Sequence, residues 1–441
     1  MTVVLATGAV LLVLALLYVV HRWLWIRLVR DTTTAGSRPR RVLTVTAFAL
    51  PLLALAALSA ERVGAPFWLQ QLVSWPGYLW LPVLLYLTLA MLVGEAVRAV
   101  WLRRAARAGR GAYEAPVAEL AATPAPPAAE ARPSADEAPA SSGSAGPAAS
   151  SADEAPADPG APSAAADLTR RTFVARAVAG AAVAAAAGTV GYGTYGVLRG
   201  PRVKRVTVPL AKLPRAAQGF RIAVVSDVHL SAVLGRAHTE RIVETVNRTQ
   251  SDLIAIVGDL VDGDVGDLRG AAEPLARLRA RHGTYFVTGN HEYFSGAQQW
   301  IDHVRELGLT PLENARREMP YFDLAGVNDI AGEREGQGPD FGRALGDRDR
   351  SRAAVLLAHQ PVVIHDAVRH GVDLQLSGHT HGGQLWPGNY LAELANPTVA
   401  GLERYGDTQL YVSRGAGAWG PPVRVGAPSD ITVVELASYQ A

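Results

Sequence analysis

Three long apolar runs near the N-terminus constrain the fold of this chain more than any other feature. They cover residues 3–20, 42–60 and 78–97, and Glu95 is the one charged residue within them. A helix needs about 20 apolar residues to cross a hydrocarbon core of ~30 Å, so each run is long enough. Uncharged runs of this length are typical of transmembrane helices. We therefore predict a membrane region over residues 1–110 that contains three transmembrane helices.

The arginines around these runs predict how the region is oriented. Six lie between the first and second runs and five follow the third: Arg22, Arg27, Arg30, Arg38, Arg40 and Arg41, then Arg98, Arg103, Arg104, Arg107 and Arg110. The loop between the second and third runs, residues 61–75, has Arg62 as its only basic residue. Because loops rich in arginine and lysine stay in the cytoplasm, the N-terminus and this second loop are predicted to lie outside.

Two segments connect the membrane region to the rest of the chain. Residues 111–168 are dominated by alanine, proline, serine and acidic residues, so we predict a disordered linker that cannot bury enough apolar surface to fold. In residues 169–199, the pair Arg170-Arg171 and then Phe173 precede an apolar segment rich in alanine and glycine. It resembles a twin-arginine (Tat) export signal, and a fourth transmembrane helix fits it equally well. Both interpretations predict a multi-pass membrane protein whose C-terminal domain is extracytoplasmic.

The composition restricts the chemistry of any site. The chain has no cysteine, which excludes disulfides, thiolate zinc sites and cysteine nucleophiles. Any metal must therefore be bound by histidine, carboxylate, amide or water. The formal net charge is +2, so the composition does not indicate a nucleic-acid-binding surface.

From about residue 203 the sequence is typical of an α/β domain. Short apolar runs that favour strands cover residues 221–226, 253–257, 283–287, 353–357 and 372–376, and stretches with helical spacing lie between some of them. Such alternation of strands and helices predicts a layered α/β core.

Each of these five predicted strands is followed by polar residues that can bind a metal ion. The motifs are Asp227-Val-His229, Gly258-Asp259-Leu-Val-Asp262, Gly289-Asn290-His291-Glu292, His359-Gln-Pro361 and Gly378-His379-Thr-His381. The C-terminal ends of parallel strands cluster at one edge of an α/β sheet, where ligands bind. Imidazoles and carboxylates that converge there would suit a transition-metal site.

In this order, the motifs resemble those of the calcineurin-like metallophosphoesterase family, and in particular its membrane-anchored or Tat-exported bacterial subgroup. The resemblance covers about residues 203–436 and includes the later Val412-Ser-Arg-Gly415. It implies that residues 203–441 form a four-layer α/β/β/α sandwich, preceded by the transmembrane helices.

The resemblance also implies a site for two divalent transition metal ions. Seven residues would be the ligands: Asp227, His229 and His381 for the first ion, Asn290, His359 and His379 for the second, and Asp259 as a bridge between both. Mixed imidazole, carboxylate and amide ligands suit Mn, Fe or Zn.

Four further residues take roles around these ligands. The resemblance implies that His291 is catalytic and either stabilises the phosphoryl oxygens or protonates the leaving group. Asp262 and Glu292 are expected to support the ligand residues. Arg414 is a candidate contact to the substrate phosphate.

The expected function is hydrolysis of a phosphodiester, phosphomonoester or pyrophosphate at the outer face of the membrane, by attack of a hydroxide bound to two metals. Anchoring in the bilayer favours a lipid or envelope component as substrate, and the Tat machinery would be a partner if the Tat-like segment is used. The alternative is a non-catalytic membrane sensor or scaffold that binds metal and ligand, because an enzyme needs only one anchor.

Overall fold

The computed structural model describes residues 2–113 and 164–439. Within these ranges, four helices are long and apolar enough to cross a membrane. They are α1 (Thr2–Trp25), which continues into the π-helical turn η1 (Ile26–Arg30), α2 (Arg38–Ser59), α3 (Phe67–Tyr113) and α4 (Ala164–Leu198). α3 and α4 extend into the two ends of the predicted linker, and the remainder of that linker lies outside the described residues.

The long helices are held together by close packing and by ion pairs. Gly77 of α3 lies so near α2 that a Cβ atom would overlap the carbonyl group of Leu53. Small residues allow such an approach between helices in membranes. The charged residue of the third apolar run, Glu95, pairs with Arg27 of η1 at 3.2 Å and with Arg98 at 2.8 Å. This carboxylate is therefore neutralised within the bundle.

The C-terminal part of the chain forms two six-stranded sheets. The first contains, in spatial order, β1 (Arg202–Leu210), β12 (Asp430–Ser438), β2 (Phe220–Val225), β3 (Leu253–Val257), β4 (Thr284–Val287) and β5 (Thr310–Pro311). The second contains β10 (Gly401–Tyr405), β11 (Thr408–Val412), β9 (Leu374–Ser377), β8 (Ala353–Leu357), β7 (Phe322–Gly326) and β6 (Ala315–Glu318). The strands that precede the polar motifs are parallel within each sheet: β2 with β3 and β4, and β8 with β9.

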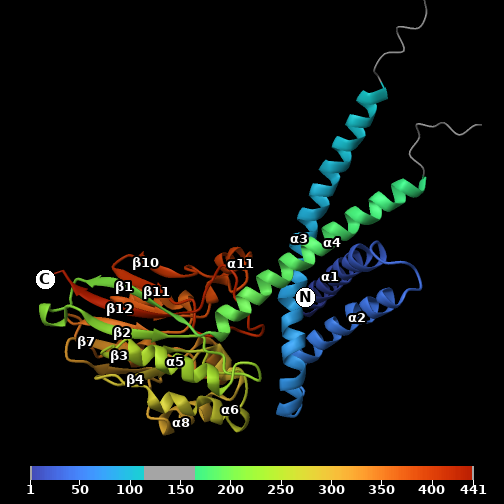
Figure 1. The fold of residues 1–441 in the computed structure, drawn as a ribbon. Coiled ribbons are helices and arrows are strands. Elements are labelled where there is room, and N and C mark those ends of the chain that lie inside the picture. Colours follow the sequence, from blue (N-terminus) through green and yellow to red (C-terminus); the bar gives the residue numbers. More distant parts are fainter. Residues whose placement is uncertain (1, 114–163, 440–441) are drawn as a thin grey trace, which may run out of the picture.

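The two sheets pack face to face and helices cover their outer faces (Figure 1). Helices α5 (Arg236–Arg248), α6 (Val265–Ala272) and α8 (Ala297–Glu306) pack on the first sheet, and α9 (Phe341–Leu345) and α10 (Ile364–Arg369) pack on the second. Strands covered on both faces are apolar throughout, as in β3, where every side chain is buried. The predicted four-layer α/β/β/α sandwich is confirmed.

The sandwich contacts the long helices directly. The hydroxyl group of Tyr86 in α3 donates a hydrogen bond of 2.9 Å to the carbonyl group of Trp386. Leu385, Val423 and Val425 of the sandwich join an apolar cluster formed by α1, α3 and α4. The domain therefore rests against the helices, and α4 ends at Leu198, just before β1 begins.

Candidate metal centre and active site

All seven candidate ligands lie immediately after strands that end at the same edge of the sandwich. The first sheet supplies Asp227 and His229 after β2, Asp259 after β3 and Asn290 after β4, and the second supplies His359 after β8 and His379 and His381 after β9. Because the sheets pack face to face, the ends of these strands lie opposite one another. The structure therefore brings together residues from five separate motifs.

Most of these residues have a strained backbone. Five have a left-handed φ between 50° and 73°: Asp227, His229, Asp259, His379 and His381. Residues other than glycine rarely adopt this conformation, and each instance costs ~1–3 kcal/mol. The sharp turn that it produces directs each side chain back across the strand ends. Such strain at one edge of a domain is typical of functional sites.

Asp227, His229 and His381 form the first group of potential ligands. Nε2 of His229 lies 3.0 Å from Nε2 of His381, and the latter lies 3.4 Å from Oδ1 of Asp227. Asp227 and His229 are completely buried, and His381 is nearly so. The group therefore presents two imidazole nitrogens and a carboxylate to one point.

Asp259, His359 and His379 form the second group. Nε2 of His359 lies 3.1 Å from Oδ2 of Asp259, while its Nδ1 is paired at 2.8 Å with the carbonyl oxygen of Val257. Nδ1 of His379 lies 3.0 Å from Oδ1 of Asn290, which brings Asn290 to this second group.

Asp259 lies between the two groups. Its Oδ2 atom is 3.1 Å from His359 and 3.7 Å from His229. Its Oδ1 atom accepts a hydrogen bond of 2.9 Å from the backbone of His291. The carboxylate also lies against Gly289, where any Cβ atom would overlap Oδ1. Glycine is thus required at position 289 for Asp259 to reach this place.

The pKa values of three of these residues favour the protonation states that bind metal ions. Burial acts to raise the pKa of Asp259, but the charges of His359 and His229 hold it well below its usual range. Burial lowers the pKa of His381 well below its usual value, and burial together with His359 lowers the pKa of His379 to about 4. A deprotonated carboxylate and neutral imidazoles are the forms that bind metal ions.

His291 lies beside the ligands and carries a proton at neutral pH. Burial opposes its charge, but the hydrogen bond with Asp262 and the charge of Asp259 raise the pKa of His291 to about 9. Its Nδ1 atom is 2.7 Å from Oδ1 of Asp262, and its ring packs against those of His229 and Trp419. The imidazole is thus held in one orientation at the edge of the ligand groups.

Asp262 connects His291 to the first group of ligands. The same Oδ1 atom also lies 2.9 Å from Nδ1 of His229. Burial acts to raise the pKa of Asp262, but His229 and His291 lower it to about 2. A carboxylate on Nδ1 leaves Nε2 of His229 directed towards His381, as expected of a residue that orients a metal ligand.

Glu292 and Arg414 lie in two different environments near the ligands. Glu292, at the start of α7 (Asn290–Phe294), is completely buried and accepts hydrogen bonds from the backbone of Asp259, Leu260 and Gly289. It thereby holds two motif loops together. The stem of the Arg414 side chain lies against the turn at Gly382, next to His381.

Comparison with known proteins identifies the family. Calcineurin-like phosphoesterase domains match residues 220–383. An uncharacterized metallophosphoesterase from Aquifex aeolicus is 34% identical over 240 residues, which cover 53% of this chain and 91% of that protein. The chain belongs to the calcineurin-like phosphoesterase family. The match includes β2, β3, β4, β8, β9 and all five motifs.

Two other relatives are longer than the shared domain. A zebrafish (Danio rerio) transmembrane protein with a metallophosphoesterase domain is 38% identical over 259 residues, or 56% of this chain and 59% of that protein. An uncharacterized metallophosphoesterase from Helicobacter pylori is 39% identical over 247 residues, or 55% of this chain and 66% of that protein. The chain thus spans about three fifths of the length of such relatives. Its own apolar helices indicate that this family member associates with a membrane.

The donor atoms of this calcineurin-like phosphoesterase fit divalent cations. Each of the two groups places three ligand atoms within 4.8 Å of one another, and a third group of His229, Asp259 and His291 overlaps them. Nε2 of His359 is buried and has no hydrogen-bond partner. Burial opposes a charge on His359, but Asp259 beside it raises the pKa of His359 well above its usual value, so a bound divalent cation would take the place of the proton on this nitrogen.

Sequence reasoning missed two charged residues near the phosphoesterase site. Arg424 is buried and donates hydrogen bonds to the carbonyl group and Nδ1 of His381, each at 3.0 Å. Glu61, in the loop between α2 and α3, lies near Asp262, and partial burial together with that charge raises its pKa. No local pattern marks either residue, because each contact joins segments far apart in the chain.

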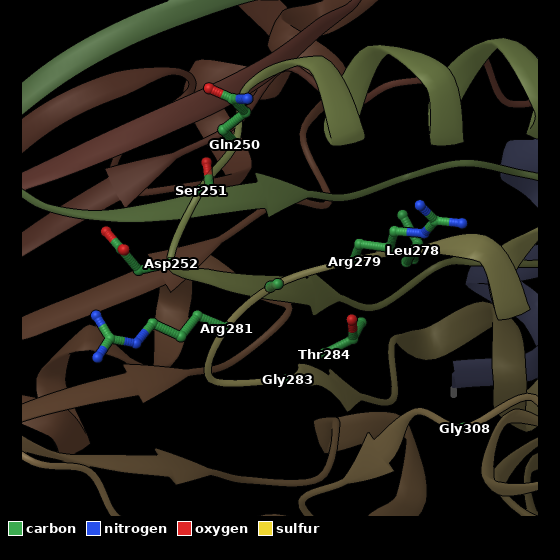
Figure 2. Close-up of a pocket in the computed structure, with 10 residues that line it drawn as sticks. Gln250, Ser251, Asp252, Leu278, Arg279, Arg281, Gly283, Thr284 and Gly308 are labelled. Atoms are coloured by element: carbon green, nitrogen blue, oxygen red, sulfur yellow. The ribbon is translucent and has the colours of Figure 1, made fainter.

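Cavities in the described part of the chain include one beside the site and one away from it. One of 530 Å³ borders the site and is lined by Asn290, His379, Phe294 and the turn η4 (Ile330–Glu335). The other, of 540 Å³, lies between the start of β3 and the start of β4, near Asp252, Arg281 and Thr284 (Figure 2). The second cavity is thus at the opposite ends of the strands from the candidate ligands, and only the first is placed to receive a substrate of this site.

Proposed function

We propose that this protein is a membrane-anchored, metal-dependent hydrolase of phosphoric esters. The convergence of two sets of buried donor atoms beside a protonated histidine carries this proposal. Nε2 of His229 faces Nε2 of His381, and Nε2 of His359 lies beside Asp259 without a hydrogen-bond partner. A sensor that only binds a ligand has no need of the positively charged His291 at the same point.

Two divalent ions, of Mn, Fe or Zn, would be held by the strand-end residues. We assign one ion to Asp227, His229 and His381, the other to Asn290, His359 and His379, and Asp259 to both. When bound, such a pair of ions supplies a nucleophilic water at neutral pH and neutralises phosphoryl charge. The residues of the chain hold the ions, and Asp262 and Glu292 fix the orientation of those residues.

His291 would act on the substrate itself. Its ring is partly exposed, with 15% of the side chain accessible, while Asp262 holds its Nδ1 atom. The protonated imidazole can stabilise the phosphoryl oxygens and donate its Nε2 proton to the leaving oxygen. The adjacent cavity, between α7 and η4, would hold the group attached to the phosphate. Arg414 is assigned a supporting contact to the phosphate.

We further propose that residues 1–110 and 169–199 cross the membrane, that 111–168 is a linker, and that 203–441 is the extracytoplasmic catalytic domain. The loop at Glu61, which has few arginines and is expected outside, is close enough to the site for burial and then the charge of Asp262 to raise the pKa of Glu61. This proximity supports a location of the site on the same side as that loop. A lipid or other envelope phosphoester is the proposed substrate class, and the Tat machinery is a proposed partner of residues 169–199.

Turnover of p-nitrophenyl phosphate and bis-p-nitrophenyl phosphate by the purified full-length protein with added Mn²⁺ tests the activity. We expect hydrolysis that Asp259→Asn abolishes and that chelation removes. Absence of turnover with Mn²⁺, Fe²⁺ and Zn²⁺ would favour a non-catalytic sensor or scaffold.

Sidedness can be tested separately because the chain has no cysteine. A single cysteine in place of the exposed Asp302 of α8 should react with a membrane-impermeant maleimide on intact cells. Labelling only after the membrane is permeabilised would place the catalytic domain in the cytoplasm.

A further inference from the structure

Helix α11 (Gly388–Ala395) exposes an apolar surface that the proposed reaction does not explain. Trp386, Tyr390, Leu391 and Leu394 have 50%, 59%, 71% and 85% of their surface exposed, and together they form what we call the α11 patch. The last three share one side of the helix, because Leu394 is four positions after Tyr390 and three after Leu391, and residues at these spacings lie close on a helix surface. A contiguous apolar patch on an exposed helix marks a surface that binds something.

The α11 patch is continuous with the surface of the long helices. Trp386 accepts the hydrogen bond from Tyr86 of α3, and its own backbone N–H donates to the carbonyl group of Val425 at 2.9 Å. The next residue back, Arg424, donates a backbone hydrogen bond to Gly193 of α4. Figure 1 shows α11 at the end of the sandwich that faces the long helices. The patch therefore begins where the membrane helices meet the domain.

Aromatic side chains on α4 lie close to the same junction. Tyr192 and Tyr195, which flank Gly193 and its contact to the domain, are 72% and 61% exposed. Tyrosine and tryptophan are enriched at the boundary between hydrocarbon and headgroups, where one end of the ring is apolar and the other is hydrated. These tyrosines and Trp386 thus supply interface-type aromatic side chains on both elements of this junction, which are joined through Arg424 and Val425.

The connection between α4 and the sandwich keeps this face at the membrane. α4 ends at Leu198 and β1 begins at Arg202, so three residues separate a candidate span from the first strand. A tether of this length keeps the domain close to the membrane end of α4. Within α11, Glu393 is the one charged residue, so the helix can lie on lipid at little electrostatic cost.

We propose that the α11 patch inserts into the interface of the bilayer that α1–α4 cross, as a second contact of the domain with lipid. This inference rests on the proposed membrane topology. It also bears on the substrate, because α11 packs on the turn η6 (His381–Gly383) that carries His381. A Cβ atom on Gly383 would overlap the backbone of Asn389 in the first turn of α11. The helix thus fixes the site relative to the headgroups, which favours a phosphoester carried by a membrane lipid.

Site-directed spin labelling of the full-length protein tests this proposal, since the chain has no cysteine to remove. The protein would be reconstituted in vesicles of phosphatidylethanolamine and phosphatidylglycerol, with a nitroxide on Leu394→Cys. Two matched labels provide the references: Val183→Cys, exposed within α4, and Asp302→Cys, exposed on α8. We expect the label at position 394 to collide more often with oxygen than with a water-soluble nickel chelate, as at position 183 and opposite to position 302.

The outcomes of this experiment distinguish a failure of the α11 proposal from a failure of the proposed membrane topology. A label at position 394 that is as accessible to nickel as that at position 302, with position 183 in lipid, would overturn the α11 proposal and leave the topology intact. Spin–spin broadening at position 394 that disappears on dilution into excess lipid would show that a second copy of the chain covers the patch, which also overturns it. Access of nickel to position 183 would instead refute the proposed span.

Discussion

Nε2 of His229 lies 3.0 Å from Nε2 of His381, although 152 positions separate the two residues in the chain. Asp262 holds the other nitrogen of His229, and Arg424 contacts the other nitrogen of His381. The two rings are therefore fixed from behind while their Nε2 atoms face one point. One shared cation can satisfy both atoms and the neighbouring Asp227, which is why this pair is central to the proposed metal centre.

Replacing His381 should strip metal from the site. Residues that only orient a ligand cost about 10–100-fold in metal affinity when lost, so we expect His381→Ala to weaken Mn²⁺ binding by more than ~100-fold. Metal content after dialysis, measured by mass spectrometry, checks this. The control is His365→Ala on the exposed side of α10, which should retain the full content. Equal metal content in both variants would remove His381 from the ligand set.

Gly289→Ala should damage the site without removing any polar group. A Cβ atom there would overlap Oδ1 and the backbone N of Asp259 and would press on the ring of His359. We expect at least a ~10-fold loss of phosphoesterase turnover, because small displacements of catalytic groups are costly. Gly270→Ala in α6, where a Cβ meets no atom within 4 Å, is the matched control and should leave turnover unchanged. Similar activity in both variants would contradict the tight packing around Asp259.

Glu292→Gln should destabilise the catalytic domain. The carboxylate accepts backbone hydrogen bonds from Asp259, Leu260 and Gly289, whereas a glutamine amide would direct an N–H group at one of these donors. An unsatisfied buried donor costs ~1–3 kcal/mol, which should lower the thermal unfolding midpoint by several degrees. The exposed Glu244→Gln on α5 provides the reference. An unchanged midpoint for Glu292→Gln would show that the glutamine is accommodated by rearrangement of these loops.

His238 should make the domain sensitive to acid. It is buried in α5, and burial together with the charges of Arg241, Arg424 and His229 lowers its pKa to about 3. The unfolded chain has the ordinary value of about 6.5 and therefore takes up the proton first as pH falls. The contribution of neutral His238 to the free energy of unfolding is therefore fully present above about pH 6.5. It is lost at up to ~1.4 kcal/mol per pH unit as pH falls towards 3.

The variant His238→Leu tests this pH dependence. Between pH 7 and pH 5, its unfolding midpoint in detergent should fall less than that of the unchanged full-length protein. His365→Leu, at an exposed position of α10, should keep the original slope. A slope unaffected by His238→Leu would assign the acid sensitivity to other groups, such as the site carboxylates.

Much of the fold follows from local sequence features. The apolar runs predict the membrane helices, and the runs that end in polar motifs correspond to β2, β3, β4, β8 and β9. Other strands have no such pattern. β6 (Ala315–Glu318) reads Ala-Arg-Arg-Glu and lies half-exposed at a sheet edge, so its pairing with β7 decides its conformation. A strand without a buried face shows no alternation of apolar and polar residues, so periodicity cannot reveal β6.

The sequence by itself determined the membrane helices, the family and the types of side chain available to a metal, because length, hydrophobicity and ligand chemistry are local properties. Only the tertiary structure decided that five strand ends meet, that Arg424 supports His381, and that Trp386, just before α11, contacts Tyr86 of α3. Each of these contacts joins segments far apart in the chain. They depend on how two sheets pack face to face and on left-handed turns at aspartate and histidine. The residue types alone do not predict such turns.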